Sequence, residues 1–124
     1  MTTPNTSYSH AATVFPVSDM EKSIVFYRDQ LQFEVLFTWM EPIDYAVLKK
    51  DGIGIHLTLQ DTRVVTSGRT ALHVFVHDVD AVYANVKQHG TIIHTTIGDR
   101  EYGMRDFDVK DPDGHIISFG MGIK

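Results

Sequence analysis

The sequence predicts an α+β fold in which the order strand, helix, strand, strand, strand occurs twice. In both halves of the chain the apolar residues change from a spacing of two to a helical spacing and back again. Each half also ends in an Asp-Gly turn between two apolar runs, at Asp51-Gly52 and Asp113-Gly114, which is typical of a β-hairpin. The length of 124 residues, 43% of them hydrophobic and 22% charged, suits one compact globular domain.

The first half is expected over residues 11–60, after a polar, flexible arm over residues 1–10. An apolar strand comes first, and Ser18 and Glu21 then have the S-x-x-E spacing of a capping box, which indicates the start of a helix. The apolar residues that follow keep helical spacing and predict one buried stripe, formed by Met20, Ile24, Tyr27 and Leu31.

The next segment alternates and is interpreted as a strand that carries Phe33, Val35, Phe37 and Trp39 on one face. An aromatic stripe on a strand more often packs in a core than contacts a ligand. Phe33 and Phe37 are therefore expected in the core, whereas core packing and ligand contact are equally compatible with Trp39. The hairpin strands are expected over 45–50 and 53–59.

The second half is expected over residues 70–124, after a connector over 61–69. A strand over 71–77 leads to Asp78, which caps a helix that Gly90 ends in the left-handed conformation. Three further strands follow, over 91–97, 104–110 and 115–119.

The two halves also resemble each other in sequence. Val17-Ser18-Asp19-Met20 corresponds to Val76-His77-Asp78-Val79, and the segment 47–57 aligns on 109–119 with a shift of 62 residues. Because turn, cap, helix phase and order agree together, a duplicated unit is the better interpretation.

Composition excludes several classes of function. The chain has no cysteine, which excludes disulfides, thiolate nucleophiles and cysteine-bound metals. The net charge of −5 and the lack of a basic stripe argue against nucleic acid. No run approaches the roughly 18 apolar residues that a membrane span needs, and the first residues do not resemble a secretory signal. We therefore expect a cytoplasmic protein.

Several motifs resemble the vicinal oxygen chelate superfamily, which includes glyoxalase I, extradiol dioxygenases and bleomycin-resistance proteins. They are Val17-Ser18-Asp19, Phe26-Tyr27-Arg28-Asp29, and the run from Tyr102 to His115, which looks most like the bleomycin-resistance branch. The resemblance implies two βαβββ modules whose sheets curl into one cup, completed in a homodimer. The sequence departs from the family at Gln32, where a glycine usually ends the first helix.

Enzymes of this superfamily hold a divalent metal at four positions, which the resemblance transfers to Ala12, His56, Ala71 and Ser118. Only His56 is a competent ligand, and one imidazole does not hold a catalytic ion. We therefore expect no cofactor. The alternative is a displaced divalent-metal site at His56 and His73, because His73 shares a strand face with Ala71.

Without a metal, the cup is expected to bind a small molecule through aromatic and polar side chains. The first hypothesis is a metal-independent binding protein that sequesters a drug or metabolite, as bleomycin-resistance proteins do. The alternative is a metal-dependent lyase, isomerase or dioxygenase, and no catalytic residue is assigned. The expected ligand-binding residues are Phe37, Trp39, Tyr45, His56, His73, Tyr102, Met104, Arg105, Phe107 and Ser118.

Overall fold

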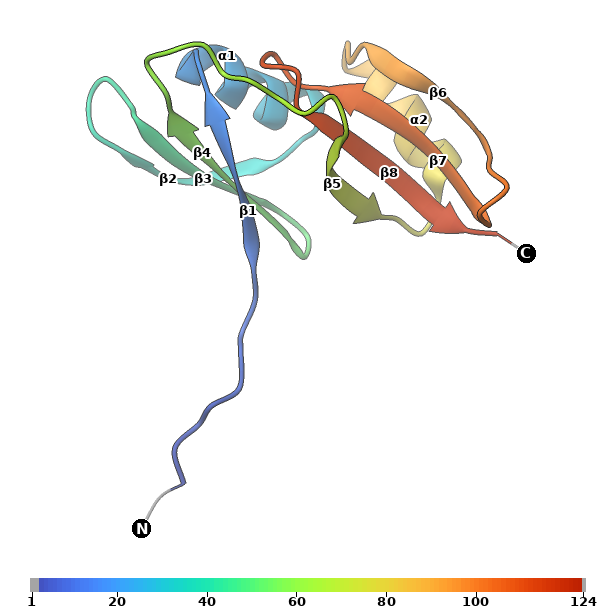
Figure 1. The fold of residues 1–124 in the computed structure, drawn as a ribbon, viewed down its shortest axis with the longest axis horizontal. Coiled ribbons are helices and arrows are strands. Elements are labelled where there is room, and N and C mark those ends of the chain that lie inside the picture. The colour runs from blue at the N-terminus through green and yellow to red at the C-terminus, as the bar shows by residue number, and fades with distance from the viewer. Residues whose placement is uncertain (1–2, 124) are drawn as a thin grey trace.

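A computed structural model describes residues 3–123 of the chain. The first two residues of the expected arm, and Lys124 at the end of the expected second half, lie outside the described residues. The predicted α+β fold is confirmed: two four-stranded mixed sheets are each accompanied by helix (Figure 1). Residues 3–11 are exposed and extend away from both sheets. Within residues 3–123, no helix has the length and apolar character needed to cross a membrane.

The two halves have the same strand order. The first half contains β1 (Ala12–Val17), α1 (Met20–Val25), a π-helical turn η1 (Phe26–Gln30), β2 (Glu34–Trp39), β3 (Tyr45–Lys50) and β4 (Ile53–Leu59). The second half contains β5 (Thr70–Phe75), α2 (Val79–Gln88), β6 (Ile93–Asp99), β7 (Met104–Lys110) and β8 (Ile116–Gly122). The sheets run β1-β4-β3-β2 and β5-β8-β7-β6, and in each the first and last strands of the half pair in parallel.

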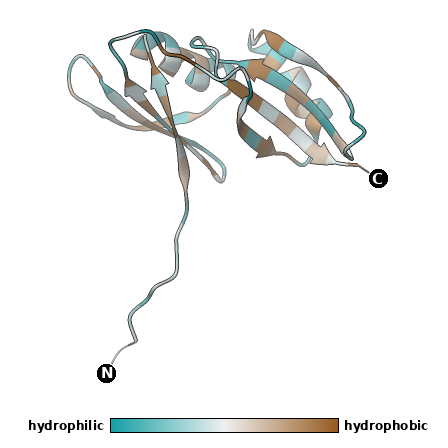
Figure 2. Cartoon of the chain, viewed as in Figure 1, coloured by the Kyte–Doolittle hydropathy of each residue, from teal (hydrophilic) through white to brown (hydrophobic). Residues whose placement is uncertain are grey.

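One hydrophobic core runs through both halves. It includes Val17, Tyr27 and Leu57 from the first half and Val79 and Phe107 from the second, all of them fully buried. Hydrophobic residues alternate with polar ones along several strands, as Figure 2 shows, because successive side chains of a strand point to opposite faces. Each sheet thus gives one face to the shared core.

Equivalent aspartates, and not a capping box, begin the two helices. The Asp19 side chain accepts a hydrogen bond from the Lys22 backbone N at 3.1 Å, and Asp78 accepts one from the Ala81 N at the same distance. The prediction for Asp78 is confirmed and the Ser18 capping box is wrong. Ser18 instead donates its hydroxyl to Asp113 Oδ1 of the second half at 2.6 Å.

Gln32 adopts the left-handed conformation that the resemblance assigns to glycine, with a φ of 64°. Gly90 occupies the same place after α2, with a φ of 89°, as predicted. The strain at Gln32 is offset by contacts between the halves. Its Oε1 accepts a hydrogen bond from Asn85 Nδ2 at 2.7 Å, and its Nε2 lies 3.1 Å from His89 Nε2.

A register shift in β2 corrects the expected aromatic stripe. Val35 pairs with the buried Leu48, whereas Phe37 pairs with Val47, so the shift at Leu36 moves Phe37 to the opposite face. Phe33 is in the core, as predicted. Phe37 is 51% exposed, and its expected core position is wrong.

The loop over residues 111–115 joins the two halves through the buried Asp111. Asp111 Oδ2 accepts a hydrogen bond from the Tyr27 hydroxyl at 2.9 Å, and Oδ1 accepts from the backbone N of Asp113 at 2.9 Å and of His115 at 2.8 Å. The His115 ring stacks on Phe15 with 4.6 Å between ring centroids, and its Nε2 donates to the Pro16 carbonyl at 2.7 Å.

Burial raises the pKa of Asp111, although the nearby His115 and the hydrogen bonds that the carboxylate accepts oppose the shift. Burial, together with the charge of Asp111, also raises the pKa of Tyr27 well above its ordinary value. Because the folded-state pKa of Asp111 is raised, its contribution to stability is complete below the unfolded-state pKa and is lost as the pH rises through the folded-state pKa.

We predict that Asp111→Asn is at least as stable as the wild type at pH 7, and that its advantage shrinks as the pH falls toward about 3. The amide keeps an oxygen for the two backbone N–H groups and offers its NH₂ to Tyr27. Asp111→Ala should lose about 2–4 kcal/mol, because it leaves those buried donors without an acceptor. Urea unfolding across this pH range measures the free energy of unfolding of both variants and of the wild type. An Asp111→Asn variant as unstable as Asp111→Ala at pH 7 contradicts the prediction.

Candidate ligand-binding site

Each sheet has a face that points away from the shared core, which we call its open face. On the first sheet, Val14 pairs with His56, His56 with Val47, and Val47 with Phe37, so these side chains form one row across the open face. Trp39 and Tyr45 pair in the next row. The strand register therefore brings together residues from all four strands of the sheet.

Aromatic side chains dominate this first open face. Phe37 and Trp39 are 51% and 57% exposed, and their ring centroids lie 6.3 Å apart. The Tyr45 hydroxyl lies 2.8 Å from His56 Nδ1, and the two rings meet edge to face. Exposed aromatic rings grouped in this way are typical of a binding surface.

The open face of the second sheet is more polar. Its central row is His73 on β5, Ser118 on β8 and Asp108 on β7, and the neighbouring row is Phe75, Gly120 and Asp106. The His73 ring packs against the exposed Phe75 ring at 4.6 Å, whereas Ser118 is buried. Equivalent positions on the two open faces therefore carry different chemistry.

A buried carboxylate, Asp106, organises the outer part of this second face. Arg100 Nε donates to Asp106 Oδ1 at 2.8 Å, and the Tyr102 hydroxyl donates to Asp106 Oδ2 at 2.5 Å. Burial alone would raise the pKa of Asp106, but the hydrogen bonds from Arg100 and Tyr102 outweigh it and hold the pKa below its ordinary value. The hydrogen bond to Asp106 raises the pKa of Tyr102.

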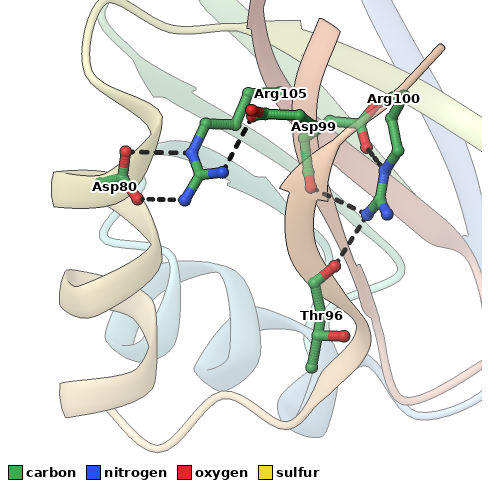
Figure 3. Close-up of polar contacts among 6 residues, drawn as sticks. Asp80, Thr96, Asp99, Arg100 and Arg105 are labelled. Carbon is green, nitrogen blue, oxygen red and sulfur yellow. Dashed lines mark hydrogen bonds and ion pairs between the residues drawn. The ribbon is translucent and has the colours of Figure 1, made fainter.

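Two expected ligand-binding residues of β7 do not lie on the open face. Phe107 is fully buried between Tyr83 and Phe119, and Arg105 pairs with Asp80 of α2 and with Asp99 at 2.9 Å each (Figure 3). We expected both residues to contact the ligand. Phe107 instead packs in the core, and Arg105 links the sheet to α2.

These two side chains lie on the other face because the strand pairing of the second hairpin differs by one residue from that of the first. Val47 lies opposite His56, but the residue opposite Ser118 is Asp108 and not Val109. The alignment by 62 residues therefore holds on β8 and fails on β7. A slip of one position moves every side chain of a strand to the other face.

The residues at the family's metal positions do not fit a metal ion. Ala12 pairs with Gly54, Ala71 lies in a register shift of β5, and Ser118 is buried. His56 lies on the first sheet and His73 on the second. Residues 3–123 contain no group of three or more His, Cys, Asp or Glu side chains arranged to hold a metal.

Other expected site residues, Trp39, Tyr45, Tyr102 and Met104, are at least partly accessible. Sequence reasoning missed Arg100 and Phe75. Only the strand register, which pairs Phe75 with Gly120 and Gly120 with Asp106, could have indicated Phe75. A hollow of about 470 Å³ lies elsewhere, between η1 and the start of β6, and none of the expected ligand-binding residues lines it.

Two βαβββ halves with open sheet faces, one of them aromatic, define a protein with the architecture predicted from the sequence resemblance. Residues 8–119 match the family model described as "Glyoxalase/Bleomycin resistance protein/Dioxygenase superfamily". The chain belongs to this superfamily.

Similar proteins include bleomycin resistance proteins of Geobacillus stearothermophilus and Staphylococcus aureus. Each is 33% identical over 127 residues, which cover 88% of this chain and 93% of the relative. Solved structures show the same fold. A bleomycin-binding protein of Streptomyces verticillus, complexed with copper(II)-bleomycin, has a TM-score of 0.77 at 24% identity and covers 95% of this chain and 99% of that one. TnmS3, an antibiotic binding protein from Streptomyces sp. CB03234, has a TM-score of 0.74 at 23% identity, with the same coverage of both chains.

Proposed function

We propose that this protein binds and sequesters a small organic drug or metabolite, of which bleomycin is the first candidate. The observation that carries the proposal is the 33% identity to bleomycin resistance proteins over nearly the whole of both chains. Binding without chemical conversion suits the residues at the family's metal positions, where Ala12 and Ala71 offer no ligand. We place this activity in the cytoplasm, which stays a prediction.

The exposed rings on the open faces support this proposal. Phe37 and Trp39 present flat apolar surface on one sheet, and Tyr102 does so on the other. A ligand with planar groups gains stacking energy on such rings of about 0.5–1.5 kcal/mol for each pair, beyond the burial of surface. The net charge of −5 suits a cationic ligand such as bleomycin.

We expect bleomycin without bound metal to change the fluorescence of Trp39, the one tryptophan of the chain, in a saturable way. Trp39→Ala should weaken binding about tenfold, measured by calorimetry, because it removes one stacking surface. Val65→Ala, which truncates an exposed apolar residue of the connector, is the control and should leave the affinity unchanged. A flat response to bleomycin and to a panel of aromatic metabolites would refute a drug-binding role.

We further propose that two copies of the chain complete the site. Val14, Phe37, Trp39 and Phe75 leave large apolar surfaces exposed on the open faces, which a second copy would cover. An aromatic cup between subunits would enclose a ligand better than either open face alone.

The homodimer predicts a mass in solution of twice the 14.0 kDa of one chain, measured by light scattering after gel filtration. Val14→Asp places a charge on the open face and should give the monomer. Val65→Asp adds the same charge at an exposed position of the connector and should stay dimeric. A wild type that is monomeric at all concentrations contradicts the proposal.

The binding is proposed to be independent of metal. Protein purified without chelator should contain less than one equivalent of any divalent metal, and dialysis against EDTA should leave the affinity for metal-free bleomycin unchanged. Elemental analysis and calorimetry measure the two quantities. A stoichiometric metal that is lost in both His56→Ala and His73→Ala would favour the alternative, a metal-dependent lyase, isomerase or dioxygenase.

A further inference from the structure

We propose that Asp106 and Arg100 are positioning residues, which hold the ring of Tyr102 on the second open face as a fixed surface for a planar group of the ligand. This inference rests on the proposed function, because it concerns the same site. It adds Arg100 and gives Asp106 a positioning role, neither of which the relatives' names assign, and it specifies a ring system as the part of the ligand that this side of the site receives.

The first step of the argument is the contrast between Tyr102 and its partner. Tyr102 is 70% exposed, whereas Asp106 is only 5% exposed. An exposed tyrosine usually leaves its hydroxyl in water and its side chain free to rotate. Here the hydroxyl donates a hydrogen bond of 2.5 Å to a buried carboxylate, which ties an exposed ring to the floor of the sheet.

The second step is that Arg100 fixes the carboxylate itself. Its Nε donates to Asp106 Oδ1 at 2.8 Å, so that both carboxylate oxygens are engaged. Its Nη2 donates to the Thr96 carbonyl at 2.7 Å and to the Asp106 carbonyl at 3.1 Å. Arg100 therefore links β6, β7 and the loop that carries Tyr102, and Figure 3 shows its contact with Thr96 of β6.

The backbone of the same loop is equally constrained. The Arg100 N donates to the Met104 carbonyl at 2.7 Å, and the Gly103 N donates to the Arg100 carbonyl at 3.0 Å. Gly103 has a φ of 87°, which closes the turn in a conformation that side chains disfavour. A tyrosine held at both its backbone and its hydroxyl loses little conformational entropy on binding a ligand.

The strand position next to this anchor is a glycine. Gly120 of β8 pairs with Asp106 on one side and with Phe75 on the other, and Phe75 is also strongly exposed. A Cβ at position 120 would lie 3.0 Å from the Asp106 Cβ and 3.1 Å from the Met104 Cε. Glycine at this position therefore lets the side chains of Asp106 and Met104 lie close to β8, between the exposed rings of Phe75 and Tyr102.

The test compares variants that remove one end of the anchor. Tyr102→Phe removes only the hydroxyl and keeps the ring, and Asp106→Ala removes the carboxylate that accepts from it. Each should bind metal-free bleomycin at least about fivefold more weakly in calorimetry. Because both changes break the same bond, the double variant should bind no more weakly than the worse single variant. Tyr83→Phe removes a hydroxyl on α2, away from the open face, and should bind as the wild type does.

A second measurement does not depend on a ligand. In the unliganded protein, ¹³C NMR relaxation of the tyrosine ring carbons should show a rigid Tyr102 ring in the wild type and a mobile one in Asp106→Ala. Tyr102→Phe changes an exposed group and keeps the proposal testable if Asp106→Ala is unstable. The positioning role is overturned if the wild type binds bleomycin and Tyr102→Phe binds it equally well, or if the Tyr102 ring is already mobile. If the wild type binds nothing while the ring is rigid, the proposed function fails and the anchor stands.

Discussion

The relative placement of the two halves depends on polar contacts between them, and the buried carboxylate of Asp111 is central to one group of these contacts. Apolar packing between the two sheets has little directional preference, whereas Asp111, together with the contacts of Ser18 and Gln32, gives it direction. Asp111 accepts from Tyr27 of the first half and from two backbone N–H groups of its own loop, and so fixes that loop against η1. His115, presented by the same loop, then stacks on Phe15 and donates to Pro16. The loop thus orients one sheet relative to the other.

The packing of the two halves also explains why the candidate site lies on the open faces of the sheets. The core takes one face of each sheet, and Tyr27 and Phe107 fill it from the two halves. The open face of each sheet makes no contact with this core and is therefore available to a ligand. Trp39 and Tyr102, two strongly exposed rings, are supported by different sheets, and their relative placement therefore depends on the contacts between the halves. In the proposed binding mode, a change in the Asp111 loop would therefore alter how the two rings are placed for a ligand.

Local signals in the sequence predicted the fold well, and long-range register limited the prediction of the site. The helix cap at Asp78, the end at Gly90 and the two hairpin turns depend on neighbouring residues, so they are readable in one dimension. The faces of Phe37 and Phe107 depend on a bulge and on a hairpin offset of one residue, and each inverts the alternation. The partnership of Arg100 with Asp106 joins a loop to a strand and has no spacing signature.

The two halves share one topology but differ in the chemistry of their open faces. The pair Val14 and His56 on the first sheet is equivalent to the pair His73 and Ser118 on the second. A metal centre built on two-fold related positions needs ligands at both members of an equivalent pair. Here His56 is equivalent to Ser118 and His73 is equivalent to Val14, so neither histidine has a second histidine or a carboxylate at its equivalent position. The two open faces are therefore unlike: one sheet presents an aromatic surface and the other a more polar one. Such an asymmetry suits a ligand that has unlike ends, because each open face can recognise a different part of it.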